Sequence, residues 1–133
     1  KVLSLDKNNA EAQRFLFLAD TELSKKDILA LIERHRAAEE GKDLLMILSD
    51  LDSPSLSRQW QSDFKLLFNA YDGIKSSISA ISVTFSSRTE ATARFSHLLT
   101  AVYKKDGKKQ FFEETKTWQL RKKEKAWVLT SAD

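Results

Sequence analysis

The chain has 133 residues, of which 41% are hydrophobic and 31% charged, with a net charge of +3 and no cysteine. This length suits one compact domain with a single core. The absence of cysteine excludes disulfides, thiol catalysis and cysteine-based zinc sites, and no apolar run approaches the roughly 20 residues of a membrane-spanning helix. Because the first residue is Lys1 rather than methionine, we expect the sequence to be a piece of a longer protein.

The charge is distributed unevenly along the chain. Residues 1–52 contain 8 basic and 11 acidic residues, a net charge of −3, whereas residues 53–133 contain 14 and 8, a net charge of +6. Many of the basic residues gather in two predicted turns, at residues 104–109 and 121–125. Two interpretations stay open for these turns: solvated hairpin ends that prevent aggregation, or a surface for an anionic partner.

The first 40 residues have the hydrophobic periodicity of helices. Asn8 or Asn9 can cap a first helix, whose apolar residues recur every three or four positions. Residues 24–27 resemble a capping box at the start of a second helix, and Gly41 offers a left-handed residue that would end it. The sequence therefore predicts two consecutive helices with a break before Ser24.

Two more helices are predicted before the periodicity changes near residue 74. A short apolar helix is expected over residues 44–51. Pro54 suits the first turn of the next helix, and Gly73 is expected to close it. The apolar side of this helix consists of Leu56, Trp60, Phe64, Leu67, Phe68 and Tyr71. Such a stripe is typical of a helix packed on a core, although it can also line a ligand pocket.

From residue 74 onward the hydrophobic pattern alternates with a period of two, which predicts strands. The strands are expected at residues 81–86, 91–103 and 111–120 and around Trp127 and Leu129. Asp106-Gly107 is a strong hairpin signal. The order of the elements, with helices followed by a meander of strands, predicts an α+β fold with the helices on one face of an antiparallel sheet. The other face of residues 91–103 becomes apolar toward its end, which predicts partial cover by a second subunit.

Several of these segments carry a resemblance to a known fold family. They are the helical run of residues 27–44, the aromatic helix ending in residues 67–71, the strand that begins Ile81-Ser82-Val83, and the ending over residues 117–129. Together they resemble the nuclear transport factor 2-like superfamily over about residues 24–131. The resemblance implies a cone in which a curved sheet wraps around a long helix and encloses a pocket. That superfamily includes ketosteroid isomerase, scytalone dehydratase and polyketide cyclases, and also non-catalytic transport and association domains, so the fold alone does not choose a function.

The first residues carry a second resemblance. Residues 2–12 are similar to the junction between tetratricopeptide repeats, with Lys7 where proline is usual. Because such repeats need neighbours to bury their faces, this segment is either the last half-repeat of an upstream array or an ordinary N-terminal helix. We therefore divide the chain into residues 1–23, the end of such an array, and residues 24–133, the cone domain. The array implies a longer bacterial protein, in the cytoplasm or in the periplasm and cell envelope.

His97 is the first candidate for catalysis. It shares a strand face with Phe95, Leu99 and Tyr103 and can point into the cone. There it would act as a general base, with the Tyr103 hydroxyl as a hydrogen-bond donor. The alternative is a core or interface histidine satisfied by one hydrogen bond, and the same alternative applies to His35.

The carboxylates offer one more candidate. The acidic residues considered for the pocket are Asp63, Asp72, Glu113 and Glu114. Glu113 and Glu114 point to opposite faces of a strand, so one of them is expected to meet a covered surface, and burial raises the pKa of an unpaired carboxyl. Glu114 is therefore a candidate catalytic residue, with Lys116 or Arg94 as the charge partner.

The sequence indicates no cofactor and no metal ion. It has no histidine pair or carboxylate cluster with ligand spacing, and its three glycines are isolated, which excludes a glycine-rich phosphate loop. The residues expected to line a pocket are aromatic: Trp60, Phe64, Phe68, Tyr71, Phe95 and Trp118.

Two functions of different classes follow. The first is a non-catalytic interaction module at the C-terminus of a repeat-containing protein, which forms a homodimer through its sheet face and can bind a protein partner. The alternative is a small-ligand-binding protein or an isomerase- or dehydratase-type enzyme that takes a small hydrophobic molecule into the cone. Nucleic acid is not an expected partner, because the basic turns lack interleaved exposed aromatic residues. The interior of the cone distinguishes the two functions. A polar pocket faced by His97 or a glutamate favours the enzyme, and an interior filled by apolar side chains excludes the enzyme.

Overall fold

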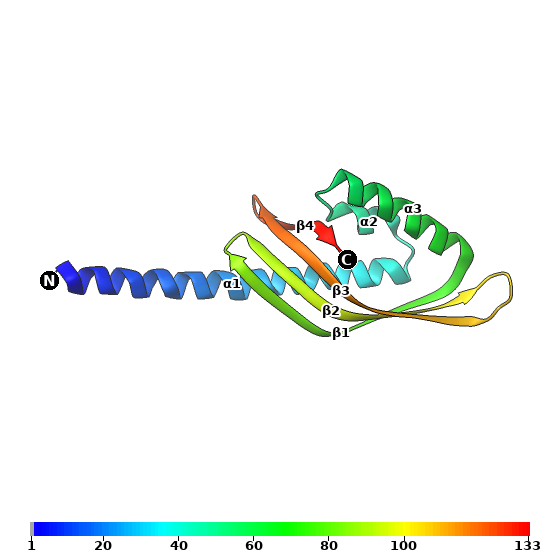
Figure 1. Cartoon of the computed structure of the whole chain (residues 1–133), viewed down its shortest axis with the longest axis horizontal. Coiled ribbons are helices and arrows are strands. Elements are labelled where there is room, and N and C mark those ends of the chain that lie inside the picture. Colours follow the sequence, from blue (N-terminus) through cyan, green and yellow to red (C-terminus); the bar gives the residue numbers. More distant parts are fainter. Residues whose placement is uncertain (1) are drawn as a thin grey trace.

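The computed structural model describes residues 2–133, with side chains from Ala10 onward. Within these residues three helices precede four strands (Figure 1). The helices are α1 (Val2–Glu40), α2 (Leu44–Ser49) and α3 (Pro54–Ala70), and the strands are β1 (Tyr71–Ser87), β2 (Glu90–Tyr103), β3 (Lys109–Lys123) and β4 (Ala126–Ala132). No helix in this part of the chain combines the length and the apolar character needed to cross a membrane.

The four strands form one antiparallel sheet in the order β1-β2-β3-β4, as the alternating pattern predicts. The sheet is curved, and the helices pack on its concave side, which confirms the predicted α+β cone (Figure 1). Three shifts interrupt the register of β1, and two of them lie at residues with positive φ, Gly73 (φ +57°) and Ala80 (φ +52°). Because a bulge bends its strand and increases the local twist, these two positions help β1 to follow the curve.

The core lies between the second half of α1 and the concave face of the sheet. Ile28, Leu31 and Ile32 of α1 are buried against the alternate residues of β2 that include Ala93 and Phe95. The first half of α1 projects beyond the sheet, toward the side opposite the β2–β3 turn (Figure 1). The convex face of the sheet has no helix over it in the described part of the chain.

The predicted break between two helices is wrong. α1 runs without interruption from Val2 to Glu40, so Asn8 and Asn9 do not begin a helix, and Ser24 lies in its middle. The side chains of Asn8 and Asn9, like those of the repeat-like residues before Ala10, lie outside the described side chains. No glycine or proline separates the two predicted segments, and the polar residues around Ser24 are tolerated within a helix.

The left-handed residue at the end of α1 is Lys42 and not Gly41, so the prediction for Gly41 is wrong. Lys42 has φ +55°, and the backbone N–H groups of Lys42 and Asp43 donate to the carbonyls of Glu39 and Ala38, the pattern of a Schellman end. The Lys42 ammonium donates to the carbonyls of Phe68 and Tyr71 at 2.8 and 2.6 Å. The lysine therefore ends one helix and caps the end of α3, a role that glycine cannot fill.

Two further boundaries differ from the sequence-based expectation, and two agree with it. α3 ends at Ala70 and β1 begins at Tyr71, so Gly73 lies in a strand bulge and not at a helix end. The expected start of this strand at residue 81 is ten residues late, because serine, lysine and glycine obscure the alternation there. Pro54 occupies the first turn of α3, and Gly107 (φ +70°) makes the β2–β3 turn, as predicted.

Candidate functional site

A cavity of about 230 Å³ lies on the concave side of the sheet. It is bounded by α1, α3, β2 and β3, with the last residues of the chain at its edge. The cavity walls combine the aromatic rings of α3, β2 and β3 with polar and ionisable side chains, among them Glu39, Asp63 and Lys116. Small-molecule sites likewise join apolar walls to polar groups that orient the ligand. The interior of the cone is therefore not filled by apolar side chains.

The aromatic wall comes from α3, β2 and β3. The ring centroid of Trp118 lies 5.0 Å from that of Phe95 and 6.0 Å from that of Trp60. Phe64 packs edge-on against Trp60 at 5.8 Å. The imidazole of His35 is inserted between these rings, 5.0 Å from Trp118 and 5.2 Å from Trp60. Because these edge-to-face and tilted contacts interlock the rings, the wall is a packed aromatic cluster.

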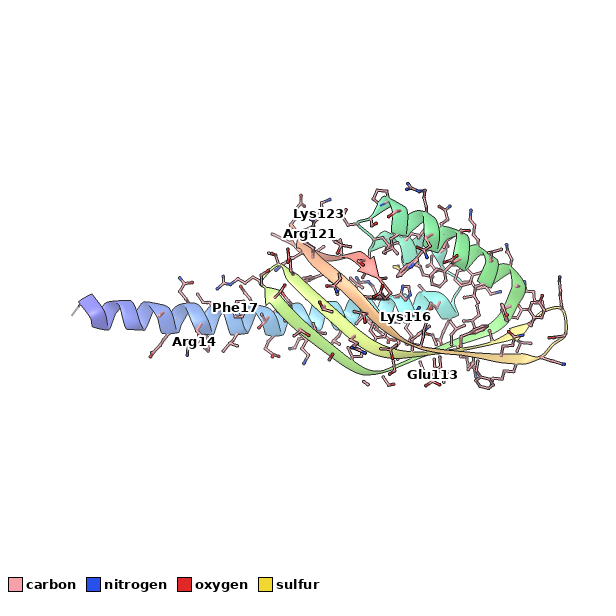
Figure 2. The ribbon with its side chains drawn as sticks, viewed as in Figure 1. Arg14, Phe17, Glu113, Lys116, Arg121 and Lys123 are labelled. Atoms are coloured by element: carbon pink, nitrogen blue, oxygen red, sulfur yellow. The ribbon has the colours of Figure 1, made fainter. Side chains whose placement is uncertain are left out.

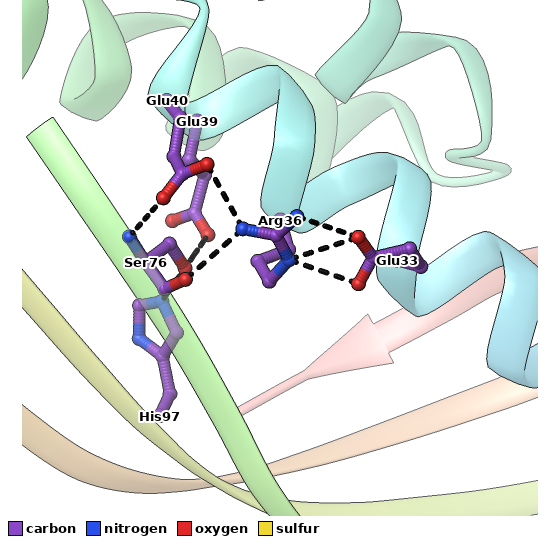
Figure 3. A network of polar contacts seen from close by, with 6 residues as sticks. All are labelled: Glu33, Arg36, Glu39, Glu40, Ser76 and His97. Carbon is purple, nitrogen blue, oxygen red and sulfur yellow. Dashed lines mark hydrogen bonds and ion pairs between the residues drawn. The ribbon is translucent and has the colours of Figure 1, made fainter.

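A buried polar network, drawn in Figure 3, contributes Glu39 and His97 to the lining of the cavity. Glu39 of α1, only 2% exposed, accepts a hydrogen bond from the Ser76 hydroxyl of β1, with Oγ and Oε1 2.9 Å apart. The same Oε1 lies 3.1 Å from Nε2 of His97 on β2. Ser76 Oγ is also 3.0 Å from this nitrogen. One carboxylate oxygen thus joins a helix to two neighbouring strands.

The charge state of Glu39 fixes the proton on His97. Burial by itself would raise the pKa of the Glu39 carboxyl, but hydrogen bonds from His97 and Ser76 and the charges of the two histidines outweigh it, and the pKa is lowered. An ionised carboxylate only accepts hydrogen bonds, so Nε2 of His97 carries the proton that points at it. In the neutral imidazole this assignment leaves the lone pair on Nδ1, which is the arrangement that an oriented general base requires.

His35 contributes differently, although it also lies near Glu39. Its Nε2 is 3.9 Å from Glu39 Oε1. Burial among the aromatic rings lowers the pKa of His35 to about 4, with Glu39 opposing this shift and the charges of His97 and Lys116 adding to it. His35 is therefore neutral near pH 7 and serves as part of the cavity wall.

A second, exposed network holds β1 against α1 from outside (Figure 3). Arg36 donates to both carboxylate oxygens of Glu33 at 3.0 and 2.9 Å and to Glu40 at 2.9 Å. The backbone of Ser76 donates to Glu40 at 3.0 Å and accepts from Arg36 at 3.2 Å. Ser76 is thus fixed by its backbone to the exposed network and by its hydroxyl to the buried one.

The structure brings some of the predicted site residues together and separates others. Those at the cavity are His97, Trp60, Phe64, Phe95 and Trp118. Phe68 and Tyr71 pack instead on a second apolar cluster around Ile74, Leu99 and Ala101. The ring of Tyr103 packs at a tilt against Tyr71, with centroids 5.3 Å apart, and Tyr103 does not line the cavity.

The prediction that Glu113 or Glu114 meets a covered surface is wrong. Both are exposed, although Glu114 is the direct cross-strand neighbour of the buried His97. Figure 2 shows Glu113 on the convex side of the sheet and Lys116 on the concave side. Glu114, with a side chain 58% exposed, forms an ion pair with Lys116 at the edge of the cavity.

Sequence reasoning missed the central carboxylate. Glu39 continues the buried stripe of α1 made by Ile28, Leu31, Ile32 and His35, one helical turn after His35. A glutamate on an apolar stripe is a signal that could have found it, because a buried carboxylate requires a partner. Ser76 carried no comparable signal, since its strand was not predicted there. Among the side chains that the structure describes, no group of three or more His, Asp or Glu residues could hold a metal ion.

Solved structures share this fold. A putative scytalone dehydratase from Novosphingobium aromaticivorans superposes with a TM-score of 0.74 and 13% identity, over 87% of this chain and 90% of the other. A hexachlorocyclohexane dehydrochlorinase gives a TM-score of 0.75 and 11% identity, over 86% and 85%. A nuclear transport factor 2-like superfamily protein from Salmonella enterica gives 0.69 and 14%, over 84% and 89%. No protein-family model matches the sequence, and no curated protein does either. The chain thus has the nuclear transport factor 2-like cone fold, at identities that establish the fold alone.

Proposed function

We propose that this chain binds a small, flat, largely hydrophobic molecule in the cone cavity and removes a proton from it, with His97 as the general base. The reaction would be of the isomerase or dehydratase type. The observation that carries this proposal is the buried His97–Glu39 pair beside an aromatic cavity. The chemistry named for two of the similar structures, a dehydratase and a dehydrochlorinase, is compatible with it.

The energetics of the pair favour a functional role. Two charged or polar groups buried together are seldom more stable than apolar residues of the same size, because both lose their hydration. Here Glu39, His97 and Ser76 are all buried, although none of them belongs to the apolar core cluster. A perturbed carboxyl with a specific partner at a cavity is characteristic of functional sites.

We infer a role for each group. His97 would accept the proton at Nδ1, and Glu39 would stabilise the imidazolium cation that forms. Ser76 holds the carboxylate in place through its hydroxyl. The cavity volume of about 230 Å³ compares with the roughly 150 Å³ in which a dry protein cavity holds benzene. It therefore suits a ligand with one or two rings, in contact with Trp60 and Trp118.

Proton abstraction can be tested without knowing the natural substrate. A panel of cyclic ketones and enones is incubated with the protein in D₂O, and deuterium uptake next to the carbonyl is followed by NMR. We expect His97→Gln to lower the uptake rate by roughly 100-fold or more, while Glu113→Gln on the convex face leaves it unchanged. Binding of a panel member, seen as shifts of the tryptophan indole signals, without His97-dependent exchange would contradict the catalytic role.

A second candidate function is supported by surfaces away from the cavity. The projecting part of α1 exposes Phe15, Leu16 and Leu23, and the convex sheet face carries the half-buried Leu98 and Val102. These surfaces support an interaction module: a homodimer through the sheet, with residues 1–23 ending a repeat array before the domain of residues 24–133. Analytical ultracentrifugation at tens of micromolar tests the dimer. A dimer that Leu98→Lys dissociates would support this function, and a monomer would contradict it.

A further inference from the structure

The β2–β3 hairpin has an unusual chemical composition at its end. It reaches beyond the helices, at the end of the molecule opposite the start of α1 (Figure 1). We call residues 104–112 the lysine hairpin. It contains Lys104, Lys105, Lys108 and Lys109, all exposed, and Asp106 as its only acidic residue. The Asp106 carboxylate accepts a hydrogen bond from the Lys108 backbone at 2.9 Å and so organises the turn.

Most of this positive charge is not neutralised within the molecule. Lys104 lies 3.8 Å from the carboxylate of Asp72, which also binds Lys42. Among the side chains that the structure describes, Lys105, Lys108 and Lys109 have no acidic group within ion-pair distance. Three ammonium groups therefore face water together at a protruding tip.

Two phenylalanines directly follow the lysines and remain in contact with water. Phe111 is 65% exposed on the convex side and Phe112 is 42% exposed on the concave side. The Lys109 ammonium lies 5.6 Å from the centre of the Phe111 ring, and Phe112 contacts only the edge of Tyr71 among the aromatic rings. The exposed rings thus adjoin the lysines at one end of the turn and are not interleaved with them.

The second basic turn shows that charge alone does not explain this composition. Residues 121–125 contain four basic residues but no exposed large apolar side chain. Two of them, Arg121 and Lys123, pair with Asp52 at 2.7 and 3.5 Å. They lie at the other end of β3, far from Glu113 (Figure 2). The second turn has the properties of a solvated hairpin end, and the lysine hairpin does not.

We propose that the lysine hairpin docks on the surface of an anionic lipid bilayer. Lysines near such a surface are attracted to its negative charge. Phenylalanine side chains beside them gain by leaving water for the boundary between headgroups and acyl chains, the combination found in interfacial membrane anchors. The inference goes beyond the proposed function, since the hairpin lies outside the cavity.

Vesicle binding of the whole chain tests this proposal. Sedimentation with phosphatidylglycerol–phosphatidylcholine vesicles should show binding that pure phosphatidylcholine does not, and added salt should release it. Replacing Lys105, Lys108 and Lys109 with glutamine should weaken this binding on the order of 100-fold. The matched control replaces Lys122, Lys123 and Lys125, removes the same charge, and should change it less than about threefold. Equal effects of the two triple variants, or no binding to anionic vesicles, would overturn the proposal.

Phe111→Thr separates a lipid surface from any other polyanion. This change keeps a β-branched residue in the strand and should weaken vesicle binding by about tenfold, because the apolar contact is lost. It should leave binding to heparin or to a single-stranded oligonucleotide unchanged. If the oligonucleotide or heparin binds more tightly than the vesicles and Phe111→Thr does not affect the vesicles, the partner is not a lipid surface and the proposal is overturned. Circular dichroism confirms that each variant is folded.

Discussion

Two consecutive glutamates of α1 bind the same strand residue in opposite surroundings. Glu39 is buried and accepts a hydrogen bond from the hydroxyl of Ser76. Glu40 is exposed and accepts a hydrogen bond from the backbone N–H of Ser76. Glu39 has the imidazole of His97 as its charge partner, and Glu40 has the guanidinium of Arg36. The pair allows a direct comparison of a carboxylate in the core with one at the surface, on one helix and against one strand.

The difference shows what each network can do. An exposed ion pair gains little, because water and salt screen the charges. The network around Arg36 and Glu40 therefore locates β1 without a large effect on stability. The buried network has a much stronger local field, because no water screens it. It can hold the imidazole of His97 in one tautomer and one orientation, which is a requirement of catalysis and not of folding.

The largest effect is expected from removing the buried carboxylate. Glu39→Ala should lower the free energy of unfolding by about 3 kcal/mol, because it leaves His97 and Ser76 buried without their common acceptor. Glu40→Ala, one residue later, should cost less than about 1 kcal/mol. Urea denaturation of both variants measures the difference. Equal losses would show that the two carboxylates are equivalent and would remove the energetic distinction between core and surface.

The sequence predicts which strand faces are buried better than it predicts where the helices end. The alternation of β2 correctly places Phe95, His97 and Leu99 on the buried face, because a strand has only two faces. The α+β cone follows from the order of helices and strands and is confirmed. Helix ends are predicted less well: Lys42 replaces Gly41 because its side chain finds carbonyls of α3, a contact between segments that are distant in sequence.

The site depends on such long-range contacts even more. Glu39 and His97 are 58 residues apart, and Ser76 and His97 are 21 apart. The pattern along the chain identifies which side chains face the core, but it does not identify which of them meet. Glu114 lies directly opposite His97 in the register of β2 and β3, but its exposed side chain pairs with Lys116. Tyr103 lies on the same strand as His97 and packs against Tyr71. Only His97 and the aromatic wall could be assigned from periodicity.

The next largest effect concerns pH and the second histidine near Glu39. His35 has a pKa of about 4 in the folded protein, below its ordinary value of 6.5. As the pH falls from 6.5 to about 4, the unfolded chain takes up a proton at this residue that the folded protein does not accept. Stability should therefore be full above pH 6.5 and fall across this interval, by on the order of 3 kcal/mol for this group.

His35→Gln isolates this contribution, because glutamine does not titrate. The variant should show a flatter dependence of the free energy of unfolding on pH between 6.5 and 4 than the unchanged protein, measured by urea denaturation in matched buffers. The lowered pKa of Glu39 acts in the same direction, but only below about pH 4.5, where its carboxyl takes up a proton in the unfolded chain. Identical pH profiles would show that the imidazole of His35 is hydrated and that the aromatic wall is open to water.

The smallest effect tests whether Ser76 links the two networks or only lies between them. Ser76→Ala removes the hydroxyl from Glu39 but keeps the backbone contacts to Glu40 and Arg36. We expect a loss of about 1–2 kcal/mol in the free energy of unfolding, because a buried acceptor loses one donor and retains the other.

Ser77→Ala is the matched control, since Ser77 is exposed on the convex face, and it should change stability by less than about 0.5 kcal/mol. If the two variants lose the same stability, the hydroxyl does not support the carboxylate, and His97 alone holds Glu39. If Ser76→Ala loses more and the NMR signal of the His97 Nε2 proton also broadens, the hydroxyl restrains both members of the pair, and the position of β1 on α1 sets the orientation of the base.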